Sequence, residues 1–347
     1  MHEGQNKLLY VSFPVDLGNR QYELRLVSLL SGICDLEVHR FNPATNHANY
    51  LSVLWGRLKA SFLLRKSIRQ AWGDNRLVFI QGLSPALFAM PLTLKGRTSL
   101  VVDWTPTIYA NLNKSLLSHV KRCLYKLLIK KQKKIYCFTH SAINHLREDY
   151  GADESKLVYL PVPFCEDLTK FAPSDSEPNL HTKLLFVGGD IRRKGGDKLI
   201  DWFEYTNKRD ISLTVVSGNC PNKPIANITY LDNINAGTEQ HTKLFAEHDV
   251  LVLPTLADSY PVVLAEAAAS GLAIVTTKFA LGAPEIVDNG CNGFICDSQE
   301  EVFDQVLKIA SNRELLDRMK RSSRTKMEND FCYEKVVKIY RQTLLVV

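Results

Sequence analysis

Long apolar runs and paired cysteines are both missing from this 347-residue sequence. No uncharged apolar stretch approaches the roughly 18 residues of a membrane-spanning helix, and the start MHEGQNKLLYVSFPVD contains no long apolar region. We therefore expect neither a signal peptide nor a transmembrane helix. The eight cysteines are scattered and form no Cys-x-x-Cys pair. A zinc site or a disulfide framework would fit them poorly, so reduced cysteines in a cytoplasmic protein are expected.

Several short functional motifs are also missing. There is no Gly-x-Ser-x-Gly elbow, no phosphate-binding P-loop and no Gly-x-Gly-x-x-Gly, which argues against hydrolase, NTPase and dehydrogenase chemistry. No zinc-finger, RNP-like or helix-turn-helix signature is present, so nucleic acid is not an expected partner, although charge alone leaves it open.

Acidic residues are scarce in much of the first half. Between Val38 and Arg147 there are 18 Lys and Arg but only two acids, Asp74 and Asp103, a net charge of +16. Because the whole chain carries +6, the remainder carries −10. This polarity indicates an anionic partner for the first half, and a membrane surface with anionic lipids is the expected one.

The segment Lys114–Lys134 holds eight of these basic residues and no acid. Its apolar residues recur at helical spacing, at Leu116, Val120, Leu124, Leu127 and Leu128. The simpler interpretation of that stripe is a helix packed on a sheet, with a solvated basic face.

Strand-like and helix-like segments alternate along the chain, which predicts parallel sheets with helices on both faces. Strands are expected near 8–13, 36–41, 77–81, 99–104, 135–138 and 157–160, then near 183–187, 212–216, 228–231, 250–253, 273–277 and 294–296. The 45% hydrophobic share suffices for two cores, and the proline-rich segment 161–182 is the natural linker. We predict an N-terminal domain over 1–165, a C-terminal domain over 166–330, and a last helix, 331–347, that crosses back to the first.

Two carboxylates, Asp258 and Glu266, flank the start of a short helix predicted near 261–270. Ser259 is the expected N-cap, and Pro261 suits the first turn, where a missing N–H costs nothing. Free amides and the positive end of the helix dipole favour a phosphate, while carboxylates accept hydrogen bonds from sugar hydroxyls. The residues alone leave open a bland alternative, in which Asp258 is only a capping acid.

A second anion site is expected after the strand that ends at Val187, in the run Gly188-Gly189-Asp190-Ile191-Arg192-Arg193-Lys194-Gly195-Gly196. Glycines admit close backbone approach, and Lys194 is a mobile cation. Taken alone, a basic turn of this kind could also be merely solvated.

The stretch from 183 to 297 resembles the family 4 retaining glycosyltransferases, whose fold is GT-B. The family pattern is an acidic residue, Ser-Phe-Gly, four residues, then Glu-Ala-x-Ala-x-Gly-x-Pro. This chain has Asp258-Ser259-Tyr260-Pro261, then Glu266-Ala267-Ala268-Ala269-Ser270-Gly271-Leu272-Ala273, and a later Gly282-Ala283-Pro284-Glu285-Ile286-Val287. The fold that this resemblance implies is two doubly wound Rossmann-like domains, with parallel sheets facing across a cleft.

The resemblance also implies roles for individual residues. Glu266 would bind the ribose hydroxyls of a donor nucleotide, and Asp258 would touch the transferred sugar. Lys194 would bind the donor diphosphate together with Arg193, which takes over from the family Arg because Gly189 stands at that position.

The remaining candidates line the same site. Gly188 and Gly189 would approach the donor through their backbone. Since Pro261 cannot donate an N–H, the amides of Val262 and Val263 are the candidate phosphate donors. In the first domain, Asp103 in Asp103-Trp104-Thr105-Pro106 is the cleft candidate, and an equally good interpretation is a turn-capping Asp before Pro106.

The expected activity is retaining transfer of a sugar from a nucleoside diphosphate donor to a lipid-linked or cell-surface polysaccharide acceptor. No Asp-x-Asp pair is present to hold Mn²⁺ or Mg²⁺, so neither a metal nor another cofactor is expected. The expected location is the cytoplasm, peripheral to the inner face of the membrane. The alternatives are a GT-B nucleotide-sugar epimerase and a catalytically weak sugar-nucleotide-binding or scaffold protein, which the substitutions at Gly189, Asp258 and Pro261 keep open.

Overall fold

The computed structural model describes residues 6–13, 17–42, 50–103, 116–164, 168–173, 181–206, 208–221, 224–232 and 234–344. The chain forms two compact units, Met1–Pro163 with Val337–Val347, and Phe164–Val336. Within the ranges above, no helix combines the length and apolar character needed to cross a bilayer.

The first unit is built on a six-stranded sheet of order β2-β1-β3-β4-β5-β6, in which every paired strand is parallel. The strands are β1 (Lys7–Ser12), β2 (Asp35–Arg40), β3 (Leu77–Gln81), β4 (Ser99–Val102), β5 (Ile135–Cys137) and β6 (Leu157–Tyr159). The helices between them are α1 (Leu17–Ser31), α2 (Tyr50–Gly73), α3 (Leu83–Phe88), α4 (Leu116–Lys130) and α5 (His140–Tyr150), with short 3₁₀ turns at Leu92–Lys95 and Glu154–Lys156.

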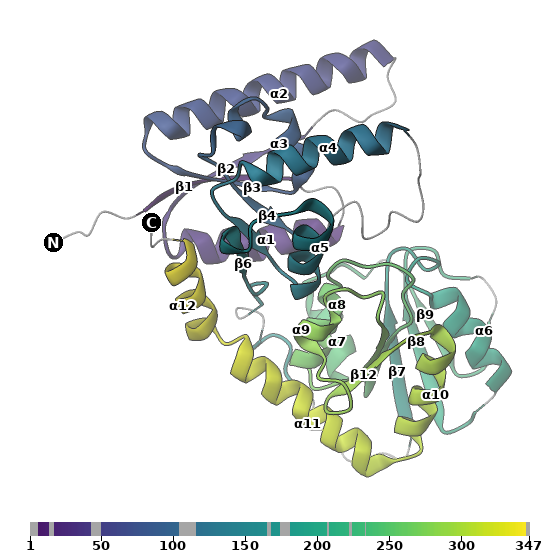
Figure 1. Ribbon diagram of the computed structural model, residues 1–347. Helices are drawn as coiled ribbons and strands as arrows, with labels where there is room; N and C mark the ends of the chain where they lie inside the picture. The colour runs from purple at the N-terminus through teal and green to yellow at the C-terminus, as the bar shows by residue number, and fades with distance from the viewer. Residues whose placement is uncertain are drawn as a thin grey trace. The chain divides into compact units, whose positions relative to one another are not determined.

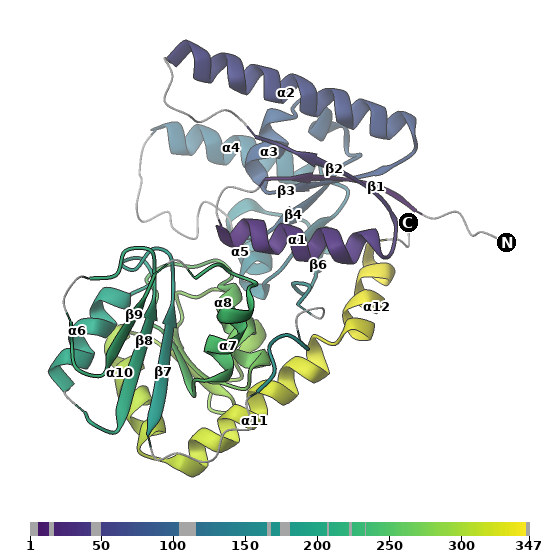
Figure 2. The same ribbon diagram turned by 180° about the vertical axis from the view of Figure 1, so that it is seen from behind.

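Helices cover both faces of this sheet. Helix α1 lies on one face, while α2, α3 and α4 lie together on the other (Figures 1 and 2). Leu64 and Ile68 of α2 share one core with Leu128 and Ile129 of α4 and with Val11 of β1. The core therefore forms where each helix turns its apolar stripe to the sheet.

Helix α4 packs through a different stripe from the one expected. Of the α4 side chains whose burial is described, those of Tyr125, Leu128 and Ile129 are buried, whereas those of Val120 and Leu127 are exposed. The predicted stripe was therefore wrong in part, because Leu spacing alone does not tell which of two apolar sides meets the sheet.

The end of the chain belongs to the first unit. In helix α12 (Tyr333–Leu344), the Tyr340 hydroxyl donates a hydrogen bond to the Pro161 carbonyl at 2.9 Å. Tyr136 Oη on β5 donates to the Thr343 carbonyl at 3.2 Å. Both bonds fix the last turns of α12 to residues of the first unit.

The second unit repeats the architecture with a parallel sheet of order β12-β11-β10-β7-β8-β9. Its strands are β7 (Thr182–Val187), β8 (Ile211–Val216), β9 (Ile228–Leu231), β10 (Val250–Leu253), β11 (Ala273–Thr277) and β12 (Gly293–Cys296). Its helices are α6 (Gly196–Thr206), α7 (Glu239–Ala246), α8 (Val262–Ala269), α9 (Ala283–Ile286), α10 (Gln299–Ala310) and α11 (Arg313–Asp330).

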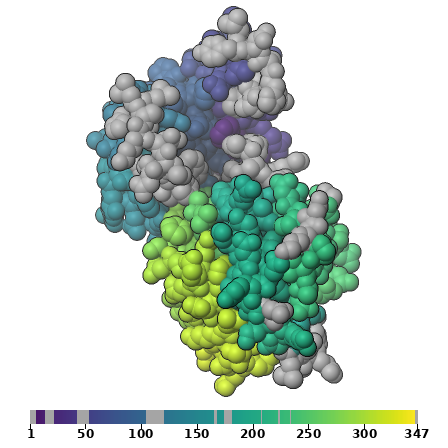
Figure 3. Space-filling model, turned by 90° about the vertical axis from the view of Figure 1, so that its right-hand side faces the viewer, coloured from purple at the N-terminus to yellow at the C-terminus, as the bar shows by residue number. Residues whose placement is uncertain are grey.

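Helices α6 and α10 pack side by side on one face of this sheet, where Trp202 stacks on Phe303 with ring centroids 4.9 Å apart. Figure 3 shows the teal and yellow-green segments of this unit adjacent on its surface. The two sheets agree with the prediction of two doubly wound domains.

The strand order of the second unit determines where a ligand can bind. From β7 the chain runs to β8 and β9 on one side, then returns to β10, β11 and β12 on the other. Strands β7 and β10 are neighbours in the sheet, and the loops that follow them therefore lead away from each other. In open α/β sheets, ligands bind in the crevice that such a reversal leaves at the carboxyl ends of the strands.

Candidate functional site

The loop after β7 is a tight turn that ends at Gly195. The amide of Lys194 donates to the Asp190 carbonyl at 3.0 Å, and the amide of Gly196 donates to the Ile191 carbonyl at 2.7 Å. Gly195 has φ +76°, and a Cβ there would collide with the carbonyl of Pro254 after β10. Only glycine combines that left-handed backbone with so close an approach.

The β7 loop is joined to the β10 loop through its backbone as well. The amide of Leu256 donates to the Arg193 carbonyl at 2.9 Å, and Thr255 Oγ1 donates to the same oxygen at 3.2 Å. Gln299 Nε2, at the start of α10, donates to the Pro254 carbonyl at 2.6 Å. These bonds hold the two loops in one register at the carboxyl edge of the sheet.

Lys194 and Asp258 form an ion pair between the two loops, and both side chains are mostly buried. Asp258 is itself fixed by its backbone: its amide donates to the Phe279 carbonyl at 3.0 Å, and its carbonyl accepts from the Leu281 amide at 2.8 Å. A buried ammonium is tolerated because this carboxylate balances it. The sequence predicted both residues for the site, and the structure brings them into contact.

Arg193 lies beside this pair but is half-exposed. Its Nη1 donates to the Ala257 carbonyl at 2.6 Å, and its Nε lies 3.5 Å from Asp190 Oδ2. The side chain thus reaches from the β7 loop to the β10 loop. A Cβ added to Gly189 would meet nothing within 4 Å, whereas one added to Gly188 would press on the Lys194 side chain. The loop therefore has free space beside the Gly189 backbone but not beside that of Gly188.

Helix α8 begins one residue later than predicted, at Val262, with Pro261 as the N-cap. The expected N-cap, Ser259, was wrong: no side chain caps this helix, because Pro261 takes the extended cap position with φ −71° and ψ 98°. The first amides of a helix have no partner inside it. Those of Val262 and Val263 therefore lie at the positive end of α8, as their sequence positions predicted.

Glu266 lies on α8 and is 6% exposed, so its carboxylate is largely removed from water. His241, at the start of α7, lies beside it with Nε2 3.9 Å from Glu266 Oε2. The imidazole packs edge-on against Phe245 and Phe171. A buried carboxylate needs polar partners, and a histidine is a suitable one.

Sequence reasoning did not find His241 or Gln299. Neither lies in a motif, and each reaches the site from a helix that starts far along the chain from the β7 loop. The helix caps Thr238 and Ser298, whose side chains accept from the amides of His241 and Glu301, mark where these helices begin but not what they face.

Asp103 lies in the other unit, directly after β4, and is partly exposed. Burial raises the pKa of Tyr10 well above its usual value, and the negative charges of Glu23 and Asp103 raise it further. Burial and then Asp103 also raise the pKa of the Cys137 thiol. Asp103 thus lies at the carboxyl edge of the first sheet, near Tyr10 of β1 and Cys137 of β5. The following residues of the expected turn, 104–106, lie outside the described residues.

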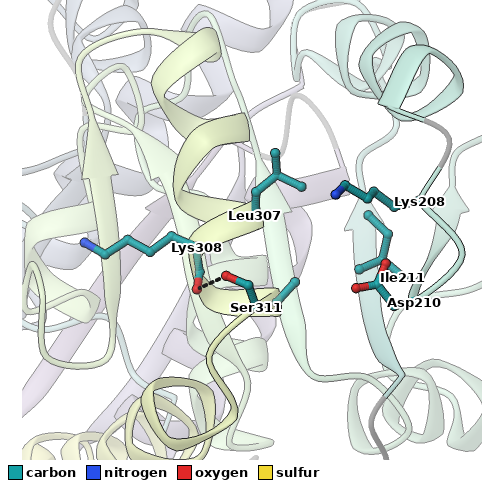
Figure 4. A pocket seen from close by; sticks show the side chains of 7 residues that line it. Lys208, Asp210, Ile211, Leu307, Lys308 and Ser311 are labelled. Carbon is teal, nitrogen blue, oxygen red and sulfur yellow. Dashed lines mark hydrogen bonds between the residues drawn. The ribbon is translucent and has the colours of Figure 1, made fainter.

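No group of three His, Cys, Asp or Glu side chains that could hold a metal ion occurs in the parts of the chain that the structure describes. A surface pocket lies away from the candidate site, at the opposite, amino end of β8 (Figure 4). Lys208 and Asp210 line one side of it, and Leu307 and Lys308 line the other. It shares no residue with the loops after β7 and β10.

The region that contains the second-unit site residues is similar to known proteins. Residues 181–312 match the family described as "Glycosyl transferases group 1". A curated relative from Haemophilus influenzae, an uncharacterized glycosyltransferase, is 26% identical over 183 residues, which cover 50% of this chain and 52% of the relative. The chain thus spans about half the length of that relative.

Solved structures match along nearly the whole chain. Sucrose-phosphate synthase from Thermosynechococcus elongatus aligns with a TM-score of 0.73 and 14% identity, covering 99% of this chain and 100% of that one. Anabaena Alr3699/HepE, solved in complex with UDP and glucose, aligns with a TM-score of 0.70 and 12% identity, with the same coverage. At these identities the match shows the fold, and the predicted GT-B class is confirmed. Residues 181–312 are thus similar to the group 1 family of glycosyltransferases, and the chain has the GT-B fold.

Proposed function

We propose that this chain is a retaining glycosyltransferase that moves a sugar from a nucleoside diphosphate donor to a lipid-linked or cell-surface polysaccharide acceptor. The observation that carries the proposal is the Lys194–Asp258 pair at the strand reversal of the second sheet, next to the first turn of α8. The family match supports the reaction class, and the UDP complex of the Anabaena protein supports a diphosphate donor.

In this proposal, Lys194, Arg193 and the amides of Val262 and Val263 bind the diphosphate. As the bond from the anomeric carbon to the diphosphate oxygen breaks, the electron pair leaves with the diphosphate. Fixed cations and amides stabilise that negative charge without reorganising. The acceptor hydroxyl enters on the face that the diphosphate leaves, and its proton goes to the leaving group.

The carboxylates have complementary roles. Glu266 accepts hydrogen bonds from the donor ribose, with His241 beside it. An incoming diphosphate competes for the Lys194 ammonium, so Asp258 becomes available to hydroxyls of the transferred sugar. The backbone at Gly188 and Gly189 approaches the donor, with space left at Gly189. Asp103 acts on the acceptor side.

We also propose that the protein works in the cytoplasm, peripheral to the inner face of a membrane, and without a metal. The excess of basic residues between Val38 and Arg147 supports an anionic membrane surface as the partner. A lipid-linked acceptor would be found there. In this proposal, the Lys194 and Arg193 side chains balance the diphosphate charge in place of a metal.

Nucleotide release from candidate sugar donors tests the reaction. Wild-type protein should release nucleotide continuously only when an acceptor is present, and Lys194→Ala and Glu266→Ala should each abolish that release. Lys198→Ala is the matched control, because Lys198 is a nearby exposed lysine that pairs with Asp201 on α6. It should keep wild-type activity.

The outcomes separate the alternatives. Full activity in either site variant would contradict the role given to that residue. Conversion of a donor to its epimer without release would favour the nucleotide-sugar epimerase. No turnover with any donor would favour the scaffold protein.

A further inference from the structure

Helix α2 has apolar residues on two opposite faces, and only one of them is covered in the described structure. Leu64, Ile68 and Ala71 are fully buried against the first sheet. On the opposite side, Trp55 is 70% exposed, Leu58 is 53% exposed and Phe62 is 64% exposed. An ordinary surface helix is polar on the side away from the core, so this exposed face needs an explanation.

The three exposed residues form one continuous stripe. Successive members are three and four positions apart, which places them on the same side of a helix of about 3.6 residues per turn. Leu54 and Leu63, both exposed, widen the stripe on its flanks. We call Trp55, Leu58 and Phe62 the α2 stripe. A cluster of large apolar groups of this kind marks a binding surface rather than the scattered exposure that is normal for single residues.

The charges around the α2 stripe have one sign. Helix α2 contains no acidic residue and five basic ones, Arg57, Lys59, Arg65, Lys66 and Arg69. The same spacing continues from Phe62 to Lys66 and Arg69, so the outward side passes from apolar to basic along the helix.

Helix α4 presents a similar surface. It lies in the same layer as α2, on one face of the sheet (Figures 1 and 2). It also has no acidic residue, and it exposes Val120 and Leu127 among Lys121, Arg122 and Lys130. Two helices of one layer therefore combine exposed apolar groups with positive charge alone.

We propose that the α2 stripe inserts into the headgroup region of an anionic lipid bilayer, while the lysines and arginines of α2 and α4 contact lipid phosphates. Apolar side chains ringed by Lys and Arg match the interfacial binding mode, in which burial and charge attraction add. A second copy of the chain fits less well, because two such surfaces would repel each other. This inference names the part of the protein that would contact the membrane in the proposed function. It rests on the proposed function only for the idea that the acceptor is found at that membrane.

Tryptophan emission tests the insertion directly. On addition of vesicles that contain phosphatidylserine or phosphatidylglycerol, the emission should shift to shorter wavelength, and lipids brominated near the headgroup should quench it. The chain has four tryptophans, so Trp55→Phe assigns the signal: it should keep vesicle binding but lose the shift. An unchanged spectrum for bound wild-type protein would overturn the insertion.

Vesicle sedimentation measures what the stripe contributes. The triple variant Trp55→Ala, Leu58→Ala, Phe62→Ala should bind anionic vesicles roughly 1,000-fold more weakly, since each of the three apolar side chains contributes about tenfold to partitioning. Tyr205→Ala is the control, because Tyr205 is an aromatic residue 91% exposed on α6, and it should bind like wild type.

The remaining outcomes are distinguishable. If the triple variant binds vesicles as well as wild type and only charge reversal releases it, the contact is electrostatic and the α2 stripe has no role. If wild-type protein ignores vesicles but is a dimer that the triple variant dissociates, the stripe is a contact between copies and the proposal is wrong. Nucleotide release from a soluble donor reports the transferase separately, so a failed membrane result leaves the proposed transferase reaction untouched.

Discussion

Substitution of Gly195 by Ala tests the contact between the loops after β7 and β10. The added Cβ would collide with the Pro254 carbonyl and lie 2.6 Å from Gln299 Nε2. It would also sit on a backbone with φ +76°. A left-handed alanine costs about 1–2 kcal/mol, and overpacking a closed site costs about 1–3 kcal/mol.

A central value of roughly 3 kcal/mol predicts a melting temperature about 6–12 °C lower for a unit of this size. Two matched glycines separate the causes. Gly237 has φ +83° but open space around it, so Gly237→Ala should show the backbone cost alone, about 1–2 kcal/mol. Gly189 has open space and no left-handed backbone, so Gly189→Ala should change stability by less than about 0.5 kcal/mol.

Calorimetry or chemical unfolding of the three variants provides the assay. The order of stability loss should be Gly195, then Gly237, then Gly189. If Gly195→Ala loses no more than Gly237→Ala, the two loops are not held in contact as described. The β10 loop would then not hold Lys194 in the position described above.

Three further predictions concern charge. Transferase activity should survive EDTA, and complete loss that Mn²⁺ or Mg²⁺ restores would overturn the metal-free proposal. Reversal to Glu of four basic residues, Lys121, Arg122, Lys130 and Lys131, should release the protein from anionic vesicles, because each contributes about 1 kcal/mol of attraction to anionic lipids. Added salt should do the same, because it screens charges beyond about 8 Å at physiological ionic strength. Wild-type protein that stayed in solution with anionic vesicles at low salt would contradict this. Burial lowers the pKa of His248 from its usual 6.5, so the unfolded chain binds more protons than the folded one, and the free energy of unfolding should fall as pH drops below about 6.5. His248→Gln should flatten that dependence in urea titrations, and an equal slope in the variant would refute the assignment to His248.

Much of the second sheet could be predicted to the residue. The strands at 228–231, 250–253 and 273–277 are short runs rich in apolar and β-branched residues, and the structure has the same bounds. The start of α1 was harder to predict: the helix begins at Leu17, and its first turn has no acidic residue to mark that start. Ser259 failed as a cap because Pro261 competes for the same position.

The part of the site that could be predicted is the part formed by the ends of neighbouring strands. Lys194 and Asp258 each follow a strand, and the parallel order puts those strands next to each other. Their ion pair depends on side-chain directions that no local pattern encodes. His241 reaches Glu266 from another helix, and the exposure of the α2 stripe depends on which face of an apolar helix the sheet covers. These features come from tertiary packing, so the sequence could not show them.

Nucleotide binding to the second unit tests the central claim most directly. UDP, GDP and ADP should be titrated into wild-type protein and into Lys194→Ala, Glu266→Ala and Lys198→Ala, with binding heat and thermal stability recorded. One nucleotide should stabilise wild type and Lys198→Ala by roughly 2.7 kcal/mol at about 100 times its dissociation constant, with little or no effect on the other two variants. Equal binding by all four proteins, or no binding by any, would contradict the donor site proposed at Lys194, Asp258 and Glu266.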